Sequence, residues 1–372
     1  MRVLHVASGR LYGGIERMLV TIARAAGAVP SLESAFAVAS PGRLVEELRE
    51  AGAPVHVLGD VRLRHPGSVL AGRAVLRSVL RTSRPDVVVC HAPWSYALFA
   101  GIGRQERRPV VWWQHDRATG RSAVERWART LPCDLVISNS RWTARTAQLV
   151  QPRARVEVLY CPVAAVASAA AARGAIRTAL GAAHRHVVLL AASRLDPWKG
   201  HLSLLRALRL IAPDPSWVLW IAGGVQRPRD ARYLARLQTA ARDLGIASRV
   251  RFLGERRDIA AILAAADVVV QANERPEPFG VLFAEALLAG RPVVTTDTGG
   301  APEIVDHSCG RLVTAGDLEA LGGTLAELVA DPALRARLGA AGPAHAAARC
   351  APGPVLRRLG DLLREYQNTA AA

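Results

Sequence analysis

The chain contains very little lysine and cysteine and no long apolar segment. Lys199 is the one lysine among its 48 basic residues. The cysteines are odd in number and form no CxxC pair; they are Cys90, Cys133, Cys161, Cys309 and Cys350. This pattern argues against a disulfide framework or a zinc site and predicts a reducing, cytoplasmic location. No apolar run reaches the roughly 18 residues of a membrane-spanning helix.

Signals for export, for dinucleotide binding and for metal binding are also missing. Gly13, Gly14 and Glu16 interrupt what would be the apolar part of a signal peptide, so we predict no secretory signal. The same loop contains neither GxGxxG nor the Gly-Lys-Ser/Thr of a P-loop. No HxH, HExxH or DxD pair lies in a suitable loop, and we therefore predict no catalytic metal and no cofactor.

Positive charge, in contrast, is abundant. The net charge is +17, and residues 1–162 contribute +11 of it, from 23 arginines and 12 acidic residues. Such an excess suits nucleic acid, an anionic membrane or anionic ligands. One arginine stripe is either a solvated helix face or a surface for an anionic acceptor or a membrane; its members are Arg62, Arg64, Arg73, Arg77, Arg81 and Arg84. The eight tryptophans are not interleaved with basic residues in the pattern of nucleic-acid binding.

Apolar runs alternate with helical patterns along the 372 residues, a length that favours two domains. The first half has predicted strands at 2–7, 34–39, 54–58, 86–90, 109–113, 134–138 and 155–159. The second half has them at 186–193, 217–222, 249–253, 267–272, 292–296 and 311–314. Such alternation predicts a parallel sheet covered on both faces. We therefore expect an α/β fold of two doubly wound, Rossmann-like domains facing a cleft.

The helical patterns complete this division. They lie at 42–52, 66–83, 121–131, 140–150, 201–211, 229–244, 256–265, 280–289, 301–306, 317–329 and 332–348. The predicted domains are residues 1–163 and 184–351. Residues 164–183 are an alanine-rich linker or the first helix of the second domain. In the segment 352–372, two prolines break the chain before a last amphipathic helix at 355–367.

Ligands of doubly wound sheets bind in loops at the carboxyl ends of strands. Gly13 and Gly14 open a helix after the first strand and allow close approach of a phosphate or hydroxyl, although a plain tight turn has the same pattern. A later strand ends in Gln114, His115 and Asp116. His115 is suited to donate to a sugar hydroxyl or a reacting group. The alternative is a structural histidine beside an aspartate that caps a helix.

Two further loops carry charge. Arg194 and Lys199 lie five residues apart on one loop before a helix and are placed to clamp phosphates. Because this chain uses arginine almost everywhere, the retained lysine indicates a site that needs a compact cation; chance retention is the alternative. In another loop, Gly299 and Gly300 precede Glu303, which is either a site residue or an acid favoured by the helix dipole.

The stretch 275–285 combines two carboxylates with a Phe-Gly turn. Glu277 is predicted on a proline-broken loop, and Glu285 about one and a half turns inside the helix that starts at Gly280. Free N–H groups at such a helix N-terminus suit oxygen-rich ligands. We interpret this stretch as a sugar-binding element.

Taken together, these motifs resemble the family 4 glycosyltransferases, retaining enzymes of the GT-B fold. The resemblance is carried by Gly13-Gly14-Ile15-Glu16, Arg194 with Lys199-Gly200, Phe252-Leu253-Gly254, Glu277-Pro278-Phe279-Gly280 with Glu285-Ala286, and Gly299-Gly300-Ala301-Pro302-Glu303. It covers almost the whole chain. One departure is the stretch 160–163, Tyr-Cys-Pro-Val, where family members often have an Asn-Gly turn, so acceptor contacts made there are not carried over.

The resemblance implies that the carboxy-terminal helix, about 355–367, crosses back to the first domain, and it implies a role for each motif. Arg194 and Lys199 would hold the diphosphate of a nucleotide sugar and stabilise its charge as it leaves, without a metal. Glu277 would bind hydroxyls of the donor sugar, His115 would touch the sugar, and Glu285 would bind the ribose. The other implied donor contacts are Gly13, Gly14, Gly254, Phe279, Gly280 and Val281, with Glu303, Asp116 and Gly223 as further candidates.

The predicted activity is transfer of a sugar from a UDP-sugar, or next from GDP-mannose, to a hydroxyl of a glycan, lipid-linked or small-molecule acceptor. The basic first domain suggests an anionic acceptor or peripheral contact with the inner face of a membrane. Two other interpretations stay open. One is another GT-B enzyme, a phosphorylase or a nucleotide-sugar epimerase, although Lys199 lies in the wrong loop to hold pyridoxal phosphate. The other is a non-enzymatic basic protein that binds nucleic acid.

Overall fold

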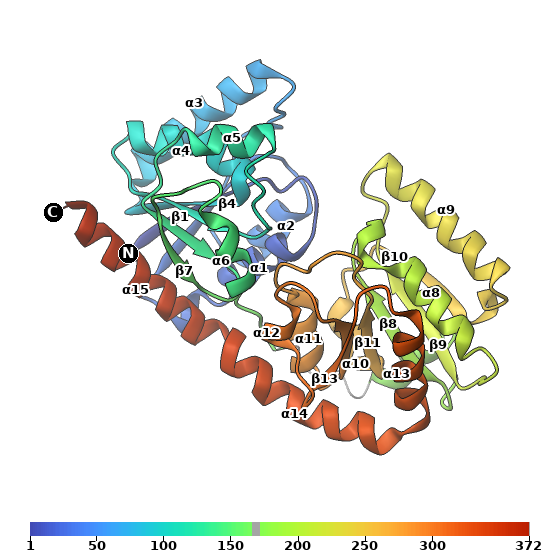
Figure 1. Ribbon diagram of the computed structural model, residues 1–372. Coiled ribbons are helices and arrows are strands. Elements are labelled where there is room, and N and C mark those ends of the chain that lie inside the picture. Colours follow the sequence, from blue (N-terminus) through green and yellow to red (C-terminus); the bar gives the residue numbers. More distant parts are fainter. Residues whose placement is uncertain (166–171, 372) are drawn as a thin grey trace. The chain divides into compact units, whose positions relative to one another are not determined.

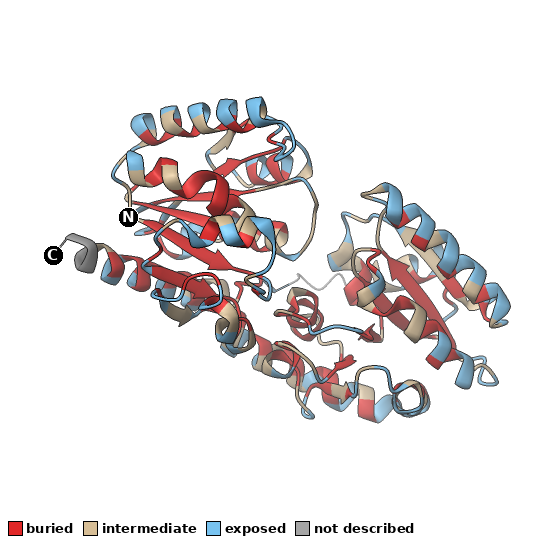
Figure 2. Ribbon diagram, turned by 45° about the horizontal axis from the view of Figure 1, so that its top comes forward, coloured by how far each residue is buried: buried red, intermediate tan, exposed pale blue. Residues whose placement is uncertain are grey.

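The computed structural model describes residues 1–165 and 172–371, with side chains as far as residue 367. The chain divides into two compact units. Unit 1 contains residues 1–163 and 350–372, and unit 2 contains residues 164–349. The first unit's boundary at Val163 coincides with the position expected from the sequence. Figure 2 shows that the central strands of both units are buried, whereas the helices have exposed outer faces.

Unit 1 is built on a parallel sheet of seven strands in the order β3-β2-β1-β4-β5-β6-β7. Its strands are β1 Arg2–Ala7, β2 Glu33–Val38, β3 Val55–Val57, β4 Val87–His91, β5 Val110–Gln114, β6 Leu135–Ser138 and β7 Arg155–Val158. The central strands β4 and β5 are buried along their whole length. They read as continuous apolar runs because helices cover both faces of a parallel sheet.

The helices of unit 1 are α1 Gly14–Arg24, η1 Ala26–Ala28, α2 Arg43–Glu50, α3 Pro66–Ser83, α4 Ala92–Gln105, α5 Ala123–Arg129, α6 Arg141–Ala147 and α15 Pro352–Ala371. Residues of α3 and α4 share one apolar cluster with alternate residues of the central strands, such as Leu4, Val88 and Trp112. The intervening residues of these strands point to the opposite face, since side chains alternate along a strand.

The carboxy-terminal helix α15 packs against the sheet of unit 1 (Figure 1). Tyr366 donates from its hydroxyl to the Asp134 carboxylate at 3.0 Å, and Gln367 donates from its side-chain amide to the Asp86 carbonyl at 3.0 Å. The predicted start of this helix at residue 355 is wrong, because α15 begins at Pro352. Proline is tolerated in the first turn of a helix, where its missing N–H would have no partner in any case.

Unit 2 has a parallel sheet of six strands in the order β10-β9-β8-β11-β12-β13. These strands are β8 Val187–Ala192, β9 Trp217–Ala222, β10 Val250–Gly254, β11 Val268–Gln271, β12 Val293–Thr296 and β13 Gly310–Val313. The helices are α7 Arg173–Ala179, η3 Pro197–Lys199, α8 His201–Leu210, α9 Pro228–Asp243, η4 Ala247–Arg249, α10 Ile259–Ala265, α11 Val281–Leu288, α12 Ala301–Ile304, α13 Leu318–Ala330 and α14 Pro332–Cys350. Side chains of α8, α9 and α13 share one apolar cluster with β8 and β9.

The alanine-rich stretch at 164–183 is in part a helix of unit 2. Residues 166–171 lie outside the described part of the chain, and α7 follows. Asp267, just before β11, holds this helix in place: its carboxylate accepts from Arg173 at 2.5 Å and from Arg177 at 2.8 Å. It also accepts from the Val188 amide of β8 at 2.7 Å. From Arg173 onward the segment is therefore the first helix of the second domain, one of the two predicted alternatives.

Among the described residues, no helix is both long enough and apolar enough to cross a membrane.

Candidate functional site

The strand order places two predicted site loops side by side in unit 2. β8 and β11 are neighbours, with β9 and β10 on one side and β12 and β13 on the other. The connections after β8 and after β11 therefore run in opposite directions. Such a switch point is where doubly wound sheets bind ligands, beyond the carboxyl ends of the strands. The loop after β8 carries Arg194 and Lys199, and the loop after β11 carries Glu277.

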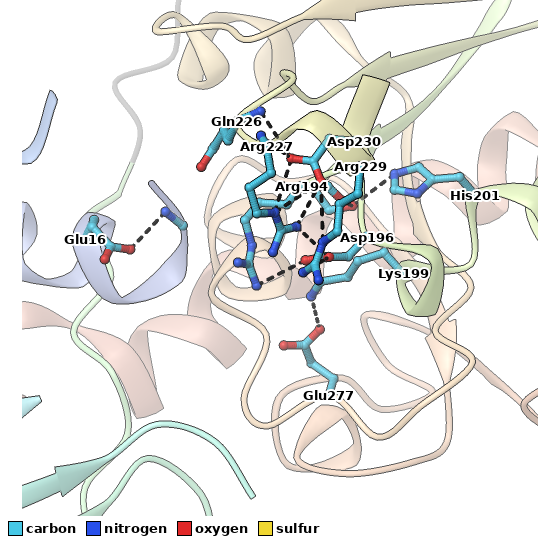
Figure 3. A network of polar contacts seen from close by, with 12 residues as sticks. Glu16, Arg194, Asp196, Lys199, His201, Gln226, Arg227, Arg229, Asp230 and Glu277 are labelled. Atoms are coloured by element: carbon cyan, nitrogen blue, oxygen red, sulfur yellow. Dashed lines mark hydrogen bonds and ion pairs between the residues drawn. The ribbon is translucent and has the colours of Figure 1, made fainter. Parts of the chain in front are cut away.

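Lys199 and Glu277 form an ion pair at this switch point (Figure 3). The Lys199 Nζ lies 2.6 Å from Oε2 of Glu277, and the two side chains are only 12% and 10% exposed. The ammonium group also lies 4.0 Å from the centre of the Trp198 ring. A lysine so enclosed by an aromatic face and a carboxylate is held in one place, as a charge-stabilising site requires.

Gly200 allows this close approach of the two loops. Its φ is +73°, and a Cβ there would lie 1.6 Å from the carbonyl oxygen of Ala272. Any side chain at this position would thus collide with the backbone that follows β11. Glycine is required because it alone combines the left-handed conformation with so short a distance.

The carboxylate of Glu277 is fixed by three donors that all reach the same oxygen. Besides Lys199, Gln271 donates from Nε2 to Oε2 at 2.8 Å, and Asn273 makes a weak contact from Nδ2 at 3.4 Å. Oε1 receives no hydrogen bond from the residues that the structure describes. Glu277 therefore has one oxygen committed to the protein and one available to a ligand.

The Gly-rich turn after β12 supports the backbone of Glu277. Gly299 forms an isolated parallel bridge with Glu277, and the Gly300 amide donates to the Glu277 carbonyl at 2.6 Å. A Cβ on Gly299 would lie 2.2 Å from that carbonyl oxygen. Gly299 thus serves close packing beneath the site. Glu303 lies in the first turn of α12, as the sequence predicted.

Arg194 belongs to a cluster of arginines around a buried aspartate (Figure 3). Asp196, whose side chain is 8% exposed, lies 3.4 Å from Arg194, 2.6 Å from Arg227 and 3.5 Å from Arg229. Arg227 also pairs with Asp230 at 3.1 Å. Three guanidinium groups face two carboxylates, so the cluster keeps a net positive charge beside Lys199.

Sequence reasoning missed several of these residues: Asp196, Arg227, Asp230, Gln271 and Asn273. Arg227 follows β9, and a search for charge after every strand would have found it. Another missed residue is His201, whose Nε2 lies 3.1 Å from the Ser193 hydroxyl. Burial, and after it the Lys199 charge, lowers the pKa of His201 to about 4, so this ring is neutral.

The second glutamate of the stretch lies on α11, which begins at Val281. Gly280 precedes it with φ +94°, and a Cβ there would lie 2.2 Å from the Phe283 ring. Glu285 is buried inside the helix, and Phe279 is buried before it. The first N–H groups of α11 have no carbonyl one turn earlier in the helix. Gly254 ends β10 with φ +67°, and a Cβ there would meet nothing within 4 Å, so its left-handed conformation alone favours glycine.

Gly223 follows β9, and a Cβ on it would lie 2.2 Å from the Ser193 carbonyl oxygen. This glycine packs the loop after β9 against the loop that carries Arg194. It acts through backbone packing within unit 2.

In unit 1, α1 begins at Gly14 and has Gly13 as its N-terminal cap residue. The Glu16 carboxylate accepts from the Gly13 amide at 2.9 Å. Of the predicted residues after β5, His115 is buried and Asp116 is exposed. The alternative in which Asp116 caps a helix is wrong, because the next helix, α5, begins at Ala123 with Ser122 as its cap.

The predicted arginine stripe on α3 is partly neutralised. Arg81 lies 2.9 Å and Arg77 3.4 Å from the same carboxylate oxygen of Glu106. Arg73 donates to the Leu98 carbonyl at 2.8 Å and stacks near the Trp127 ring. These contacts fit a solvated helix face.

One group of side chains in the described part of the chain has the spacing of metal ligands: Asp306, Cys309 and His345. It lies on the loop before β13 and on α14, whereas Lys199 and Glu277 lie on the loops after β8 and β11. At the site on the loops after β8 and β11, the Glu277 carboxylate is already paired with the Lys199 ammonium group.

Comparison with known families decides the classification. Residues 12–165 match the family model described as Glycosyltransferase Family 4, and residues 172–345 match that of Glycosyl transferases group 1. The chain belongs to glycosyltransferase family 4. Its two all-parallel sheets have the GT-B fold, as predicted.

Two bacterial glycosyltransferases are similar to about half of the chain. It is 36% identical over 201 residues to the GDP-mannose-dependent monoacylated alpha-(1-6)-phosphatidylinositol monomannoside mannosyltransferase of Corynebacterium glutamicum, which covers 52% of this chain and 51% of the other. It is 37% identical over 177 residues to the D-inositol 3-phosphate glycosyltransferase of Corynebacterium jeikeium, covering 46% and 42%. The chain thus spans about half the length of these relatives or less.

A solved structure covers the whole fold. Anabaena HepE in complex with UDP-glucose superposes with a TM-score of 0.87 and 26% identity, covering 98% of this chain and 100% of the other.

Proposed function

We propose that this family 4 protein transfers a sugar from a nucleotide-diphosphate sugar to a hydroxyl group, with retention of configuration and without a metal ion. The observation that carries this proposal is the enclosed ion pair between Lys199 and Glu277 at the switch point of unit 2. One member of the pair suits a phosphate, and the other suits sugar hydroxyls.

Departure of the nucleoside diphosphate develops negative charge on its phosphate oxygens. Lys199 and Arg194 are cations already in place on one loop, and preorganised charges stabilise a transition state at little cost of reorganisation. The Asp196 carboxylate, itself fixed by Arg227, holds Arg194 in position. In this proposal, the incoming phosphate replaces Glu277 as the main partner of Lys199.

Glu277 then orients the sugar. Its Oε2 stays bound to Gln271 Nε2, and Oε1 accepts from a sugar hydroxyl. The bond between the anomeric carbon and the phosphate oxygen breaks, and both electrons pass to that oxygen. The acceptor hydroxyl forms the new bond on the same face, and its proton passes to the leaving phosphate. This route requires no side-chain base.

The donor is a UDP-sugar or, as the next candidate, GDP-mannose. A relative named above is GDP-mannose-dependent, and HepE was solved with UDP-glucose. The acceptor is a hydroxyl of a glycan, a lipid-linked or a small molecule. The net charge of +11 in residues 1–162 supports an anionic acceptor and peripheral contact with an anionic membrane from the cytoplasmic side.

A thermal-shift panel of UDP, GDP, ADP and TDP, followed by transfer assays with UDP-glucose and GDP-mannose, tests the proposal. A ligand that binds the native state alone raises its apparent stability. We expect one diphosphate to raise the melting temperature and the Lys199→Met variant to reduce that rise. Arg206→Met, an exposed change on α8, is the control and leaves the rise intact. No rise with any nucleotide, together with no transfer, would overturn the proposal.

A further inference from the structure

Three histidines form a continuous hydrogen-bonded chain inside unit 1. His5 on β1, His91 at the end of β4 and His115 just after β5 come from three neighbouring strands. Nδ1 of His5 lies 3.0 Å from Nε2 of His91, and Nδ1 of His91 lies 2.9 Å from Nε2 of His115. All three rings are buried, with exposures of 0%, 2% and 4%. β1 and β4 flank the switch point of this sheet, where ligands of such folds bind.

The surroundings keep the three rings neutral. Burial lowers the pKa of His5 and His115 to about 3. Burial, followed by the neighbouring histidines, places the pKa of His91 well below its ordinary value. The rings also stack on their neighbours: His5 lies 5.3 Å from Phe36, and His91 lies 5.3 Å from Trp113, between ring centres. The rings are therefore packed in one orientation.

Neutral rings in such a chain must adopt matched tautomers. A neutral imidazole has one N–H donor and one acceptor nitrogen, and each contact needs one of each. Two arrangements satisfy both contacts: every ring protonated on Nδ1, or every ring protonated on Nε2. The choice at one end of the chain is thus transmitted to the other end.

The inner end favours the first arrangement. Within the described part of the chain, Nε2 of His5 is buried and has no hydrogen-bond partner. Protonation on Nε2 would leave a buried N–H without an acceptor, which is rare in folded proteins. Protonation on Nδ1 leaves only an unused lone pair there and directs the N–H of His5 to His91.

The outer end then becomes a donor. With its Nε2 accepting from His91, His115 carries its proton on Nδ1. Nδ1 makes no hydrogen bond with the described residues and is not among their fully enclosed polar atoms that lack a partner. The backbone beside it is fixed by Asn139, which donates from Nδ2 to the His115 carbonyl at 3.1 Å.

We propose that this histidine chain holds His115 as a hydrogen-bond donor through Nδ1, with His5 and His91 as positioning residues. The inference rests on the proposed function and on the role that the family resemblance implies for His115, which is contact with the donor sugar. The group it recognises is an oxygen with a free lone pair, such as a sugar hydroxyl acting as acceptor. Glu277 has the opposite hydrogen-bonding role, since its carboxylate can only accept hydrogen bonds.

The tautomers are directly measurable in the full-length protein. Two-bond proton–nitrogen correlation spectra of protein labelled with ¹⁵N-histidine distinguish a protonated ring nitrogen from one with a lone pair. Single substitutions of His5, His91 and His115 assign the signals. We expect protonated Nδ1 and bare Nε2 on all three rings at neutral pH. A protonated Nε2 on His115 or on His5 would overturn the proposal, whether or not the protein transfers sugar.

Steady-state kinetics provides a second test of the proposal. His91→Phe removes both contacts, and we expect kcat/KM for the donor to fall about five- to tenfold, the value of one net hydrogen bond. His91→Gln retains one acceptor and one donor in the side chain and should recover most of this loss. His65→Phe, at an exposed histidine of the same unit, is the control. Equal activity of the Phe and Gln variants would count against positioning by His91. Correct tautomers without transfer of any sugar would instead refute the proposed function.

Discussion

Nζ of Lys199 lies 2.6 Å from Oε2 of Glu277, although the two residues are 78 positions apart in the chain. The single lysine of the protein is thus paired with the carboxylate of the stretch whose composition indicated a sugar-binding element. Each group holds the other in place until a ligand arrives. A phosphate can replace the carboxylate at the lysine, and a hydroxyl can bind the carboxylate. This relationship leads to the first two predictions.

Replacement of Lys199 by methionine should lower kcat about 10²- to 10³-fold, the scale of losing one charge-stabilising donor. Lys199→Arg should not restore the rate, because a planar guanidinium does not fit the compact space beside Trp198 and Glu277. Steady-state kinetics with the donor found in the nucleotide panel checks this. Near-normal turnover of Lys199→Met would sink the assignment of Lys199.

Glu277→Ala should abolish transfer while leaving the affinity for free nucleoside diphosphate intact or stronger. The reason is that the change removes a sugar contact and also frees Lys199 from its carboxylate partner. Calorimetric titration with the diphosphate, beside a transfer assay, separates the two effects. The matched control is Glu274→Ala in the same loop, whose carboxylate pairs with the exposed Ser203 hydroxyl. Equal losses of nucleotide binding and transfer in Glu277→Ala would show that Glu277 is not a sugar contact.

Gly200→Ala and Gly245→Ala make a matched pair. Both glycines have a positive φ, +73° and +69°, but an added Cβ collides with the Ala272 carbonyl oxygen at Gly200 and meets nothing within 4 Å at Gly245. The backbone conformation alone should cost about 1–2 kcal/mol in each variant. Gly200→Ala should lose more than this and should also weaken diphosphate binding, because the loop with Lys199 must shift. Urea unfolding and the thermal-shift panel measure both, and identical behaviour of the two variants would contradict the steric argument.

Stability should fall as the pH drops below about 6.5. His5 and His115 have folded pKa values of about 3, and that of His91 is also depressed, so the unfolded chain binds protons that the native chain does not. Their contribution is complete above the unfolded pKa and is lost as the pH falls towards about 3. Below the unfolded pKa of about 6.5, each histidine lowers the free energy of unfolding by about 1.4 kcal/mol per pH unit, so the three together lower it by about 4 kcal/mol between pH 7.5 and 5.5.

Urea unfolding monitored at these two pH values checks this expectation. His5→Phe should remove about 1.4 kcal/mol of the pH-dependent loss, whereas His65→Asn, at an exposed position, should leave the loss unchanged. A loss that is the same in His5→Phe as in the unmodified protein would contradict burial of a neutral His5.

Much of the fold was predictable because local patterns dictate it. The helix predicted at 66–83 coincides with α3 Pro66–Ser83, and the strand predicted at 217–222 coincides with β9 Trp217–Ala222. Proline in the first turn and the spacing of apolar residues indicate the helix at 66–83. The same local reasoning misplaced the start of α15, because Pro352 and Pro354 read as a break but lie in a first turn.

The site was only partly predictable. Lys199 stood out through lysine scarcity, and Glu277 and Glu285 through their place around a Phe-Gly turn. Asp196 and Gln271 did not stand out, since nothing in their neighbours distinguishes a buried hydrogen-bond partner from a surface polar residue. The histidine chain escaped for the same reason: His5 and His91 each lie in an ordinary apolar strand.

The sequence by itself determined that the chain is two α/β units with charged loops after particular strands, because hydrophobic periodicity and glycine positions are local properties. Tertiary structure alone decided which loops meet. Strand order in a parallel sheet depends on which strands pair, and pairing of β8 with β11 brings Lys199 to Glu277. Pairing of β1 with β4 and of β4 with β5 likewise aligns three histidines that are far apart in the chain.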